Sequence, residues 1–351
     1  MRIVIAMSGG VDSSVAAALL KNQGYEVVGL SMQIWGNYRE RCERSCCSPS
    51  HLEDARAVAV KLGIPHYVVD FRNEFESKVV DYFCREYLCG RTPNPCIICN
   101  DELKFKTLWA KAQALGAERI ATGHYARIIR ESGQYWLKRG LDRSKDQSYF
   151  LFGLSEEMLA HTLFPLGEYT KSQTREMAKS LGLSVAQKKE SQEICFIPDN
   201  NYQEFLKKRH PECFIKGDIL DVQGRKLGVH QGIAHYTIGQ RRGLGLFHEQ
   251  PLYVIKIDAV NNNIMVGEKK DLAAKGLLAS GGNIDRFSGI IRMQAQIRYR
   301  HTPVFATLYP LGNNKAKIEF DQPQFAVTPG QAAVFYQDDT VLGGGWIEEA
   351  L

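Results

Sequence analysis

The sequence predicts an α/β protein: a doubly wound, mostly parallel sheet, then a small central domain and a C-terminal β-barrel. Three observations predict it. Strand-like and helix-like segments alternate over residues 1–200, as they do in parallel sheets with crossover helices. Glycine and short β runs become frequent after residue 200, and from Leu252 onward apolar and polar residues alternate between turn signals. We therefore expect domains over residues 1–200, 201–275 and 276–351.

The helices and strands of the first domain follow from residue composition and from the residues that end such elements. Short apolar, β-branched runs predict strands over Arg2–Met7, Glu26–Ile34, His66–Phe71 and Arg119–Thr122. Helical periodicity predicts helices over Asp12–Asn22, Ser50–Leu62, Glu74–Leu88, Leu103–Leu115, Gln147–Leu154 and Lys171–Leu181. A hairpin is expected over Tyr125–Leu137, with its turn at Ser132-Gly133.

The C-terminal third shows alternation of period two, which is typical of half-buried strands. The alternating runs are Tyr253–Ile257, Met293–Arg298, Phe305–Tyr309, Ala316–Phe320 and Ala332–Tyr336. Turn signals fall at 261–263, 312–314 and 328–330. Together they predict a small barrel.

Composition excludes several classes of protein. The chain has 351 residues, of which 44% are hydrophobic and 24% charged, as in ordinary globular proteins. Its apolar runs are far shorter than a membrane span, and Met1 leads directly into a strand without signal-peptide anatomy, so we expect a cytoplasmic protein without a membrane partner. The formal net charge is +5, and residues 201–275 hold 12 Lys/Arg against 8 Asp/Glu. This excess permits an anionic partner.

The loop Ser8-Gly9-Gly10-Val11-Asp12-Ser13-Ser14 lies between the first strand and the first helix. Paired glycines let backbone N–H groups approach a phosphate, and the helix N-terminus favours negative charge. Asp12 could contact magnesium. No lysine follows the glycines and the G-x-G-x-x-G spacing is missing, so neither the γ-phosphate P-loop nor the dinucleotide fingerprint applies. The plain alternative is a glycine turn with a helix cap.

Nine cysteines are the unusual feature of the composition, and because nine is odd they cannot all be paired. Cys99 closes the segment Thr92–Asn100, just before a predicted helix and near Lys104, which favours a low-pKa thiolate. Cys195 lies in an apolar segment. Two such cysteines facing one nucleotide pocket could carry and release sulfur through a persulfide.

These residues together resemble the bacterial tRNA-specific 2-thiouridylase family, within the N-type PP-loop ATP pyrophosphatase superfamily. The resemblance covers nearly the whole chain. Besides the loop Ser8–Ser14 it is carried by Thr92–Asn100, Lys104–Lys106, Thr122–Ala126, Lys145–Phe150, Ile194–Ile197, Tyr236–Leu244, Arg298–Arg300 and Pro329–Gln331.

The resemblance implies an enzyme that uses ATP and Mg²⁺ to adenylate O2 of the wobble uridine of tRNA. Sulfur would arrive from a sulfur-relay protein or a cysteine desulfurase as a persulfide on Cys195, and Cys99 would free it, leaving a transient Cys99–Cys195 disulfide. Asp12 would be catalytic. ATP-binding residues would be Ala6, Met7, Ser8, Gly9, Gly10, Val11, Asp12, Ser13, Met32 and Gly123. Residues contacting the anticodon stem-loop would be Asn94, Pro95, Cys96, His124, Lys145, Asp146, Gln147, Tyr299, Arg300 and Gln331.

One departure leaves an alternative open. Many relatives have Asp where this chain has Cys96, so that Cys96, Cys99 and Cys195 could hold a [4Fe–4S] cluster. We favour the persulfide route. Two other readings are a different PP-loop enzyme, either tRNA-modifying or amide-forming, and a non-catalytic zinc-containing RNA-binding protein.

The remaining cysteines and basic runs support weaker expectations. Cys42, Cys46, Cys47 and His51 are spaced as the ligands of a zinc site can be. We favour the interpretation that they belong to a charged loop without helix or strand periodicity. Buried thiols are the default for Cys84, Cys89 and Cys213. Among the basic runs, Arg241-Arg242 is a candidate phosphate contact, whereas Lys207-Lys208-Arg209 is expected to be a solvated face.

Overall fold

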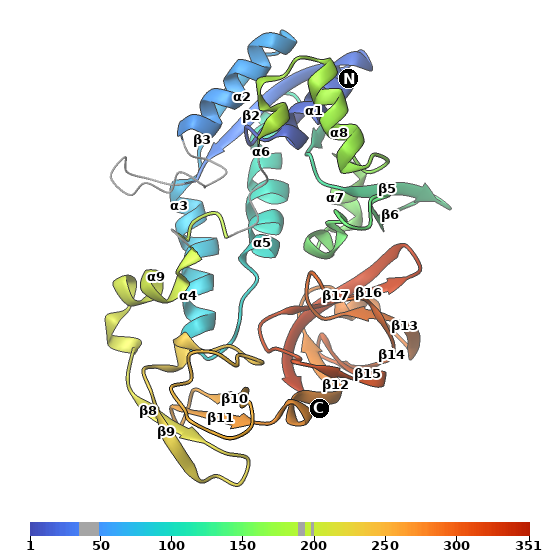
Figure 1. Cartoon of the computed structure of the whole chain (residues 1–351). Coiled ribbons are helices and arrows are strands. Elements are labelled where there is room, and N and C mark those ends of the chain that lie inside the picture. The colour runs from blue at the N-terminus through green and yellow to red at the C-terminus, as the bar shows by residue number, and fades with distance from the viewer. Residues whose placement is uncertain (35–48, 189–193, 198–199) are drawn as a thin grey trace. The chain divides into compact units, whose positions relative to one another are not determined.

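The computed structural model describes residues 1–34, 49–188, 194–197 and 200–351. They form two compact units (Figure 1). The first comprises residues 1–80, 95–200 and 339–341, and the second comprises 81–94, 201–338 and 342–351. The zinc spacing of Cys42, Cys46 and Cys47 lies outside the described residues.

A five-stranded parallel sheet forms the centre of the first unit. Its strands are β1 (Arg2–Ala6), β2 (Glu26–Gln33), β3 (His66–Asp70), β4 (Arg119–Ala121) and β7 (Thr162–Leu163), in the order β3-β2-β1-β4-β7. The chain runs from β1 outward to β3 and then returns to build β4 and β7 on the other side. The predicted doubly wound sheet is confirmed, and its order reverses between β1 and β4, where ligands bind in such sheets.

Three helices of this unit pack together: α1 (Val11–Asn22), α2 (Pro49–Leu62) and α8 (Lys171–Ser180). Helix α1 contacts β1, β2, α2 and α8. It is buried along most of its length because small residues, Ala16, Ala17 and Ala18, let these neighbours approach it closely. Helix α8 begins with a capping box between Thr170 and Gln173.

The helix predicted from Leu103 begins earlier, which corrects the expectation that Cys99 precedes a helix. Helical structure runs through α5 (Pro95–Ile98), the π-helical segment η2 (Cys99–Thr107) and α6 (Leu108–Ala114). Pro95 is suited to a first helical position because its ring fixes φ and it lacks an N–H. Cys96 therefore lies in the first turn of this helical stretch, and Cys99 lies one turn further on.

Further elements of the first unit surround this frame. They are α3 (Arg72–Phe75), η1 (Glu76–Val80), β5 (Ala126–Glu131), β6 (Gln134–Arg139), η3 (Ser148–Leu151), α7 (Glu156–Ala160) and η4 (Ser184–Gln187). The predicted hairpin is confirmed, and its turn has positive φ at both Ser132 and Gly133, as in a type I′ turn. The helix expected over Gln147–Leu154 is only the short 3₁₀ turn η3.

The second unit contains a four-stranded sheet and its flanking helices. Its elements are α4 (Asp81–Leu88), α9 (Tyr202–Arg209), η6 (Pro211–Cys213), β8 (Gly217–Leu220), β9 (Lys226–His230), η7 (Ile233–His235), β10 (Tyr253–Asp258) and β11 (Asn263–Gly267). The strand order is β10-β11-β8-β9. Ile219, Val254 and Ile264 form its small core.

A closed antiparallel barrel completes the second unit, as predicted. Its elements are η8 (Lys269–Leu272), β12 (Ala273–Ser280), η9 (Ile284–Arg286), β13 (Ile291–Gln296), β14 (Val304–Gly312), β15 (Lys315–Phe325), β16 (Ala332–Gln337) and β17 (Thr340–Ala350). The order is β12-β15-β14-β13-β16-β17, and pairing of β12 with β17 closes the barrel. Leu277, Leu308 and Ile318 are fully buried in it.

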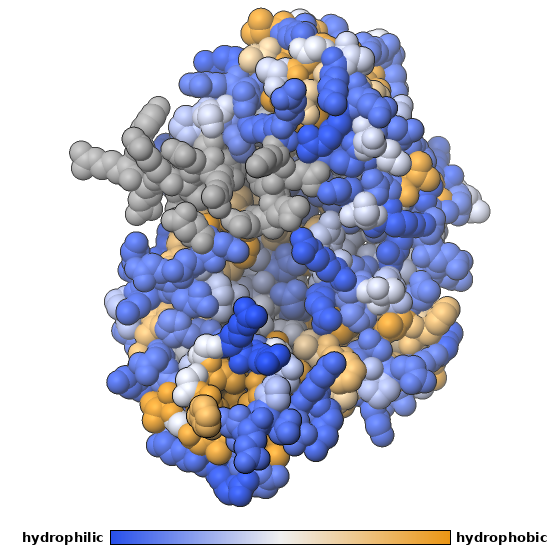
Figure 2. Space-filling view, in the orientation of Figure 1, coloured by the Kyte–Doolittle hydropathy of each residue, from blue (hydrophilic) through white to orange (hydrophobic). Residues whose placement is uncertain are grey.

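The exposed surface is of an ordinary kind. The face in Figure 2 is mostly hydrophilic, with hydrophobic residues in small groups. Within the described ranges, no helix has the length and apolar character needed to cross a membrane. The prediction of a buried thiol is confirmed for Cys84. It is wrong for Cys89, which is exposed, and for Cys213, which is partly exposed.

Candidate active site

The loop between β1 and α1 forms a cradle of backbone groups. Gly9 has φ +67°, and a Cβ there would lie 2.0 Å from the carbonyl oxygen of His51, so only glycine fits. Gly10 is the N-cap of α1, and none of the described side chains caps this helix. The first-turn N–H groups of α1 are thus available to an anion, which a helix N-terminus favours.

Residues from three neighbouring strands meet beside this loop. Ala6 ends β1, Met32 lies near the end of β2, and Gly123 follows β4. A Cβ on Gly123 would lie 2.7 Å from the backbone nitrogen of Ser13, so the segment after β4 touches the first turn of α1. The structure brings the predicted ATP-binding residues to one edge of the sheet, and their contact with ATP stays a prediction.

Replacing Gly123 by alanine is expected to lower both the affinity for ATP and the stability of the protein. The added Cβ must displace α1, and such overpacking costs about 1–3 kcal/mol. Thermal unfolding with and without ATP, together with equilibrium binding of ATP, measures the two effects. Gly289→Ala is the matched control, because nothing lies within 4 Å of its Cβ position. Equal behaviour of the two variants would show that the segment after β4 is not tightly packed on α1.

Asp12 is held by two residues from later in the chain. Lys171 Nζ lies 2.7 Å from both carboxylate oxygens, and the Tyr125 hydroxyl donates to Oδ1 at 2.8 Å. The same hydroxyl lies 2.9 Å from Thr174 Oγ1. Lys171 is only 8% exposed, whereas the Asp12 side chain is 32% exposed, so the ion pair is shielded from water on the lysine side alone.

A second lysine reaches the same loop. Lys188 Nζ donates to the carbonyl oxygen of Gly9 at 3.1 Å and to Asp54 Oδ2 at 2.5 Å. Sequence reasoning missed Lys171 and Lys188, since it searched for a lysine directly after the glycines. The Thr170–Gln173 capping box marks the helix that starts at Lys171, but it carries no signal of contact with Asp12.

The three cysteines with predicted roles all lie in the first unit. Cys96 is exposed in α5, whereas Cys99, which begins η2, and Cys195 are partly exposed. Cys195 lies in the described turn 194–197, which Phe196 fixes by packing edge-to-face on Phe75 at a centroid distance of 5.5 Å. The transient Cys99–Cys195 disulfide stays a prediction.

A cluster held by three thiolates finds no support in the described part of the chain. There, no three side chains of His, Cys, Asp or Glu come together as metal ligands. Among the described residues, Cys96, Cys99 and Cys195 therefore do not form a preassembled ligand set.

Asp101 is a shielded carboxylate in η2. Its Oδ1 is shielded from solvent and has no hydrogen-bond partner among the described residues. Burial raises the pKa of Asp101 to about 7, with nearby Glu102 adding to the effect and Lys106 opposing it. A Cβ on Gly153 would lie 2.4 Å from Asp101 Oδ2, so η2 packs tightly on the segment after η3.

Replacing Asp101 by asparagine is expected to stabilise the protein at alkaline pH. The folded-state pKa lies above the ordinary value, so the folded state loses stability as the pH rises from about 4 to about 7, where this carboxyl must ionise in a shielded place. The variant should gain about 1–3 kcal/mol at pH 8 and little at pH 4. Urea unfolding at both pH values measures this gain. A gain that does not change with pH would contradict the assignment.

Three residues of the first unit that are predicted to contact tRNA form hydrogen bonds with other residues of the protein. His124 is buried, its Nδ1 lies 2.7 Å from Thr122 Oγ1, and burial holds its pKa well below the ordinary value, so the ring is neutral. Asp146 accepts hydrogen bonds from Ser148 and from the backbone of residue 140. Gln147 Oε1 accepts from the Tyr125 backbone at 3.0 Å. These bonds shape the loop that contains Lys145, and contact with RNA stays a prediction.

The predicted tRNA contacts of the second unit lie in connecting segments. Gln331 Nε2 donates to the carbonyl oxygens of Thr92 at 2.9 Å and Pro93 at 3.3 Å, which fixes the segment that leads to Asn94. Tyr299 and Arg300 follow β13, and the Gln296 side chain donates to the Tyr299 carbonyl at 2.7 Å. Arg300 is exposed. Their contact with RNA likewise stays a prediction.

Comparisons with known proteins match the chain from end to end. Three family models match: the tRNA methyl transferase HUP domain over residues 1–199, the tRNA methyl transferase PRC-barrel domain over 203–268, and the aminomethyltransferase β-barrel domain over 279–347. The tRNA-specific 2-thiouridylase MnmA of Geotalea uraniireducens is 51% identical, covering 100% of this chain and 96% of that protein. The MnmA of Carboxydothermus hydrogenoformans is 52% identical, covering 100% and 98%.

A likeness to solved structures is much weaker. A 4-thiouridine synthetase in complex with RNA and ATP covers 60% of this chain at 16% identity, with 50% of that protein covered and a TM-score of 0.38. That score is too low to inform the site. The full-length relatives at about half identity decide the assignment, and the chain belongs to the tRNA-specific 2-thiouridylase family.

Proposed function

We propose that this protein catalyses the ATP-dependent 2-thiolation of the wobble uridine of tRNA. The observation that carries the proposal is the uncapped N-terminus of α1, set behind a glycine loop at the reversal of the parallel sheet, in a chain about half identical to 2-thiouridylases. We assign residues 1–200 to the catalytic domain, 201–275 to a central tRNA-contacting domain and 276–351 to the C-terminal barrel. The binding partner is the anticodon stem-loop of tRNA.

The first step is adenylation. Uridine O2 attacks the α-phosphorus of ATP, the bond to the β-phosphate breaks, and pyrophosphate leaves. The N–H groups at the start of α1 suit the departing phosphates, and Lys171 and Lys188 supply positive charge beside them. Asp12 would hold Mg²⁺, which neutralises phosphate charge when bound.

The second step transfers sulfur. The terminal sulfur of a Cys195 persulfide attacks C2 of the uridine, and AMP leaves. The Cys99 thiolate then attacks the Cys195 sulfur, the S–S bond to the transferred sulfur breaks, and the electron pair stays on that sulfur. The product is 2-thiouridine with a Cys99–Cys195 disulfide. Two electrons from an external thiol reset the pair, and a sulfur-relay protein or a cysteine desulfurase reloads Cys195.

Mass spectrometry of tRNA nucleosides tests this function. The protein is incubated with unmodified tRNA, Mg²⁺-ATP, a cysteine desulfurase with cysteine, and a thiol reductant. We expect 2-thiouridine at the wobble position, together with pyrophosphate and AMP in equal amounts. Omission of ATP is the control. Release of pyrophosphate without 2-thiouridine under these conditions would overturn the proposal in favour of another PP-loop activity.

A further inference from the structure

A cavity of about 610 Å³ lies in the second unit, beside the β8–β11 sheet. Its walls come from α9, from the segment after η6 and from the loop that follows η7. The lining residues are Gln203, Lys207, Phe214, Gln231, His235, Tyr236, Gln240, Arg242 and Gly243. Pockets of this size hold small organic ligands. None of the residues predicted to hold ATP or the target base belongs to it.

Two cations stand at this cavity. Lys207 lies in the last turn of α9 and Arg242 in the loop after η7, and both are exposed. They come from the part of the chain with the largest excess of positive charge. Lys207 was expected to belong to a solvated basic run, but the structure separates it from Lys208, which does not line the cavity and lies 3.8 Å from Glu204. Charge of this sign suits a phosphate group.

Aromatic rings form another part of the wall. Phe214 and His235 meet edge-to-face, with ring centroids 4.8 Å apart and an interplanar angle of 69°. Both are partly exposed, whereas Tyr236 beside them is buried. Burial and the neighbouring Lys207 and His230 lower the pKa of His235, so its ring is neutral near pH 7. Neutral rings with open faces are the surfaces on which unpaired nucleobases stack.

Side-chain amides complete the lining. Gln240 holds its own loop, since its Oε1 accepts from the Thr237 backbone at 3.1 Å and its Nε2 donates to the Arg242 carbonyl at 3.0 Å. Gln203 and Gln231 add amides that can both donate and accept. An amide beside an aromatic wall can pair with the edge of a stacked base.

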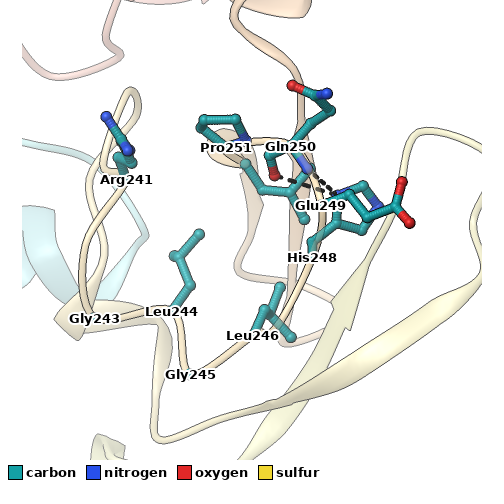
Figure 3. A pocket seen from close by; sticks show the side chains of 10 residues that line it. Arg241, Gly243, Leu244, Gly245, Leu246, His248, Glu249, Gln250 and Pro251 are labelled. Atoms are coloured by element: carbon teal, nitrogen blue, oxygen red, sulfur yellow. Dashed lines mark hydrogen bonds between the residues drawn. The ribbon is translucent and has the colours of Figure 1, made fainter.

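A neighbouring pocket lacks this combination (Figure 3). It has a volume of about 350 Å³ and lies along residues 241–252. Leu244, Leu246 and Pro251 line it, and its His248 ring bonds to Gln250 of the same loop. Arg241 is its one lysine or arginine. The pocket therefore offers no pair of cations for a phosphate.

We infer that the 610 Å³ cavity binds one unpaired nucleotide of the tRNA substrate, with the base against Phe214 and His235 and the phosphate between Lys207 and Arg242. This inference rests on the proposed function, because it takes tRNA as the ligand. It adds a second nucleotide site, in the central region, to the one that receives the target uridine. A free nucleotide shares the chemistry, and the experiment separates the two sources.

The double variant Lys207→Gln/Arg242→Gln tests the phosphate contact. Its matched control, Lys208→Gln/Lys216→Gln, removes the same charge from two exposed residues of the second unit that do not line the cavity. We expect the first variant to bind tRNA about tenfold or more weakly, with a plot of log K against log salt flatter by about 1–2, and the control to change by less than about threefold. Equal losses in both variants would overturn the inference, since general electrostatics would then explain the binding.

Phe214→Ala tests the stacking contact. We expect the Kd for tRNA to rise about 5- to 100-fold, as for loss of one base stack, with KM raised and kcat unchanged at saturating tRNA. Thermal unfolding checks the fold, and the exposed charge variants remain informative if Phe214→Ala unfolds. Titration with nucleoside 5′-monophosphates is the second arm: binding of these at micromolar concentration, with tRNA affinity unaltered in every variant, would overturn the assignment to tRNA. Thiolation by the wild-type protein separates failure of this inference from failure of the proposed function.

Discussion

Replacing Cys195 by serine is expected to abolish formation of 2-thiouridine while pyrophosphate release and tRNA binding persist. A hydroxyl cannot carry a persulfide, so no sulfur reaches the adenylated uridine. The turn that holds residue 195 should survive, because Phe196 packs on Phe75 and serine keeps the size of the side chain similar. We expect thiolation to fall by about 10³-fold or more, the scale seen when a nucleophile is removed.

Three measurements on the same sample of Cys195→Ser distinguish loss of sulfur transfer from loss of adenylation or of tRNA binding. They are nucleoside mass spectrometry, pyrophosphate release and filter binding of tRNA. Cys213→Ser is the matched control, since Cys213 is also a partly exposed cysteine, but lies in the second unit. It should behave as wild type. Loss of tRNA binding in Cys195→Ser, or thiolation at the wild-type rate, would refute the assigned role of this cysteine.

Cys99→Ser extends the argument to the partner thiol. In that variant the persulfide can still attack C2, but the thiol that we assign to break the S–S bond is missing. The tRNA should therefore accumulate as a covalent adduct with Cys195, and added dithiothreitol should release it as 2-thiouridine. This trapped species would distinguish the persulfide route from delivery of sulfide by another group.

The parallel sheet could be predicted because each strand is marked by local residues. Arg2–Met7 and Glu26–Ile34 contain runs of apolar, β-branched residues, which favour a buried strand. In these segments the local preference and the packing of the folded protein agree. The helix start at Pro95 could not be read in the same way. Residues 99–107 are π-helical, and the wider turn shifts side chains away from the 3.6-residue spacing on which the prediction relied. The prediction therefore placed the start of the helix at Leu103, inside this π-helical segment.

The residues of the candidate site likewise fall into two groups, those that a local sequence pattern predicts and those that it does not. Ser8–Ser13 were predicted as a phosphate loop since strand, glycines and helix are contiguous in the sequence. Lys171 and Lys188 were not, because they lie 159 and 179 residues from the groups they contact, Asp12 and Gly9. Closure of the barrel by β12 and β17 is equally non-local. Contacts at such separations depend on the folded topology, which a local pattern does not encode.

Replacing Asp12 by asparagine is expected to block adenylation. The side chain keeps its size but loses the charge that would hold Mg²⁺, and loss of metal assistance worth several kcal/mol lowers the rate about 10²- to 10³-fold. Pyrophosphate release in the presence of tRNA measures this rate. Asp54→Asn is the matched control, since Asp54 pairs with Lys188 beside the same loop, and we expect less than about a tenfold loss there. If Asp12→Asn and Asp54→Asn lowered pyrophosphate release equally, the loop would need only a negative charge nearby and not a carboxylate at Asp12.

A double variant separates chemistry from folding at Asp12. Asparagine leaves the Lys171 ammonium, which is 8% exposed, without its carboxylate, so the single variant should lose up to about 3 kcal/mol of stability. Adding Lys171→Met removes that buried charge and should restore much of the stability. Pyrophosphate release should stay low in the double variant, because the metal-binding carboxylate is still missing. Recovery of both properties together would show that Asp12 acts only through its ion pair with Lys171.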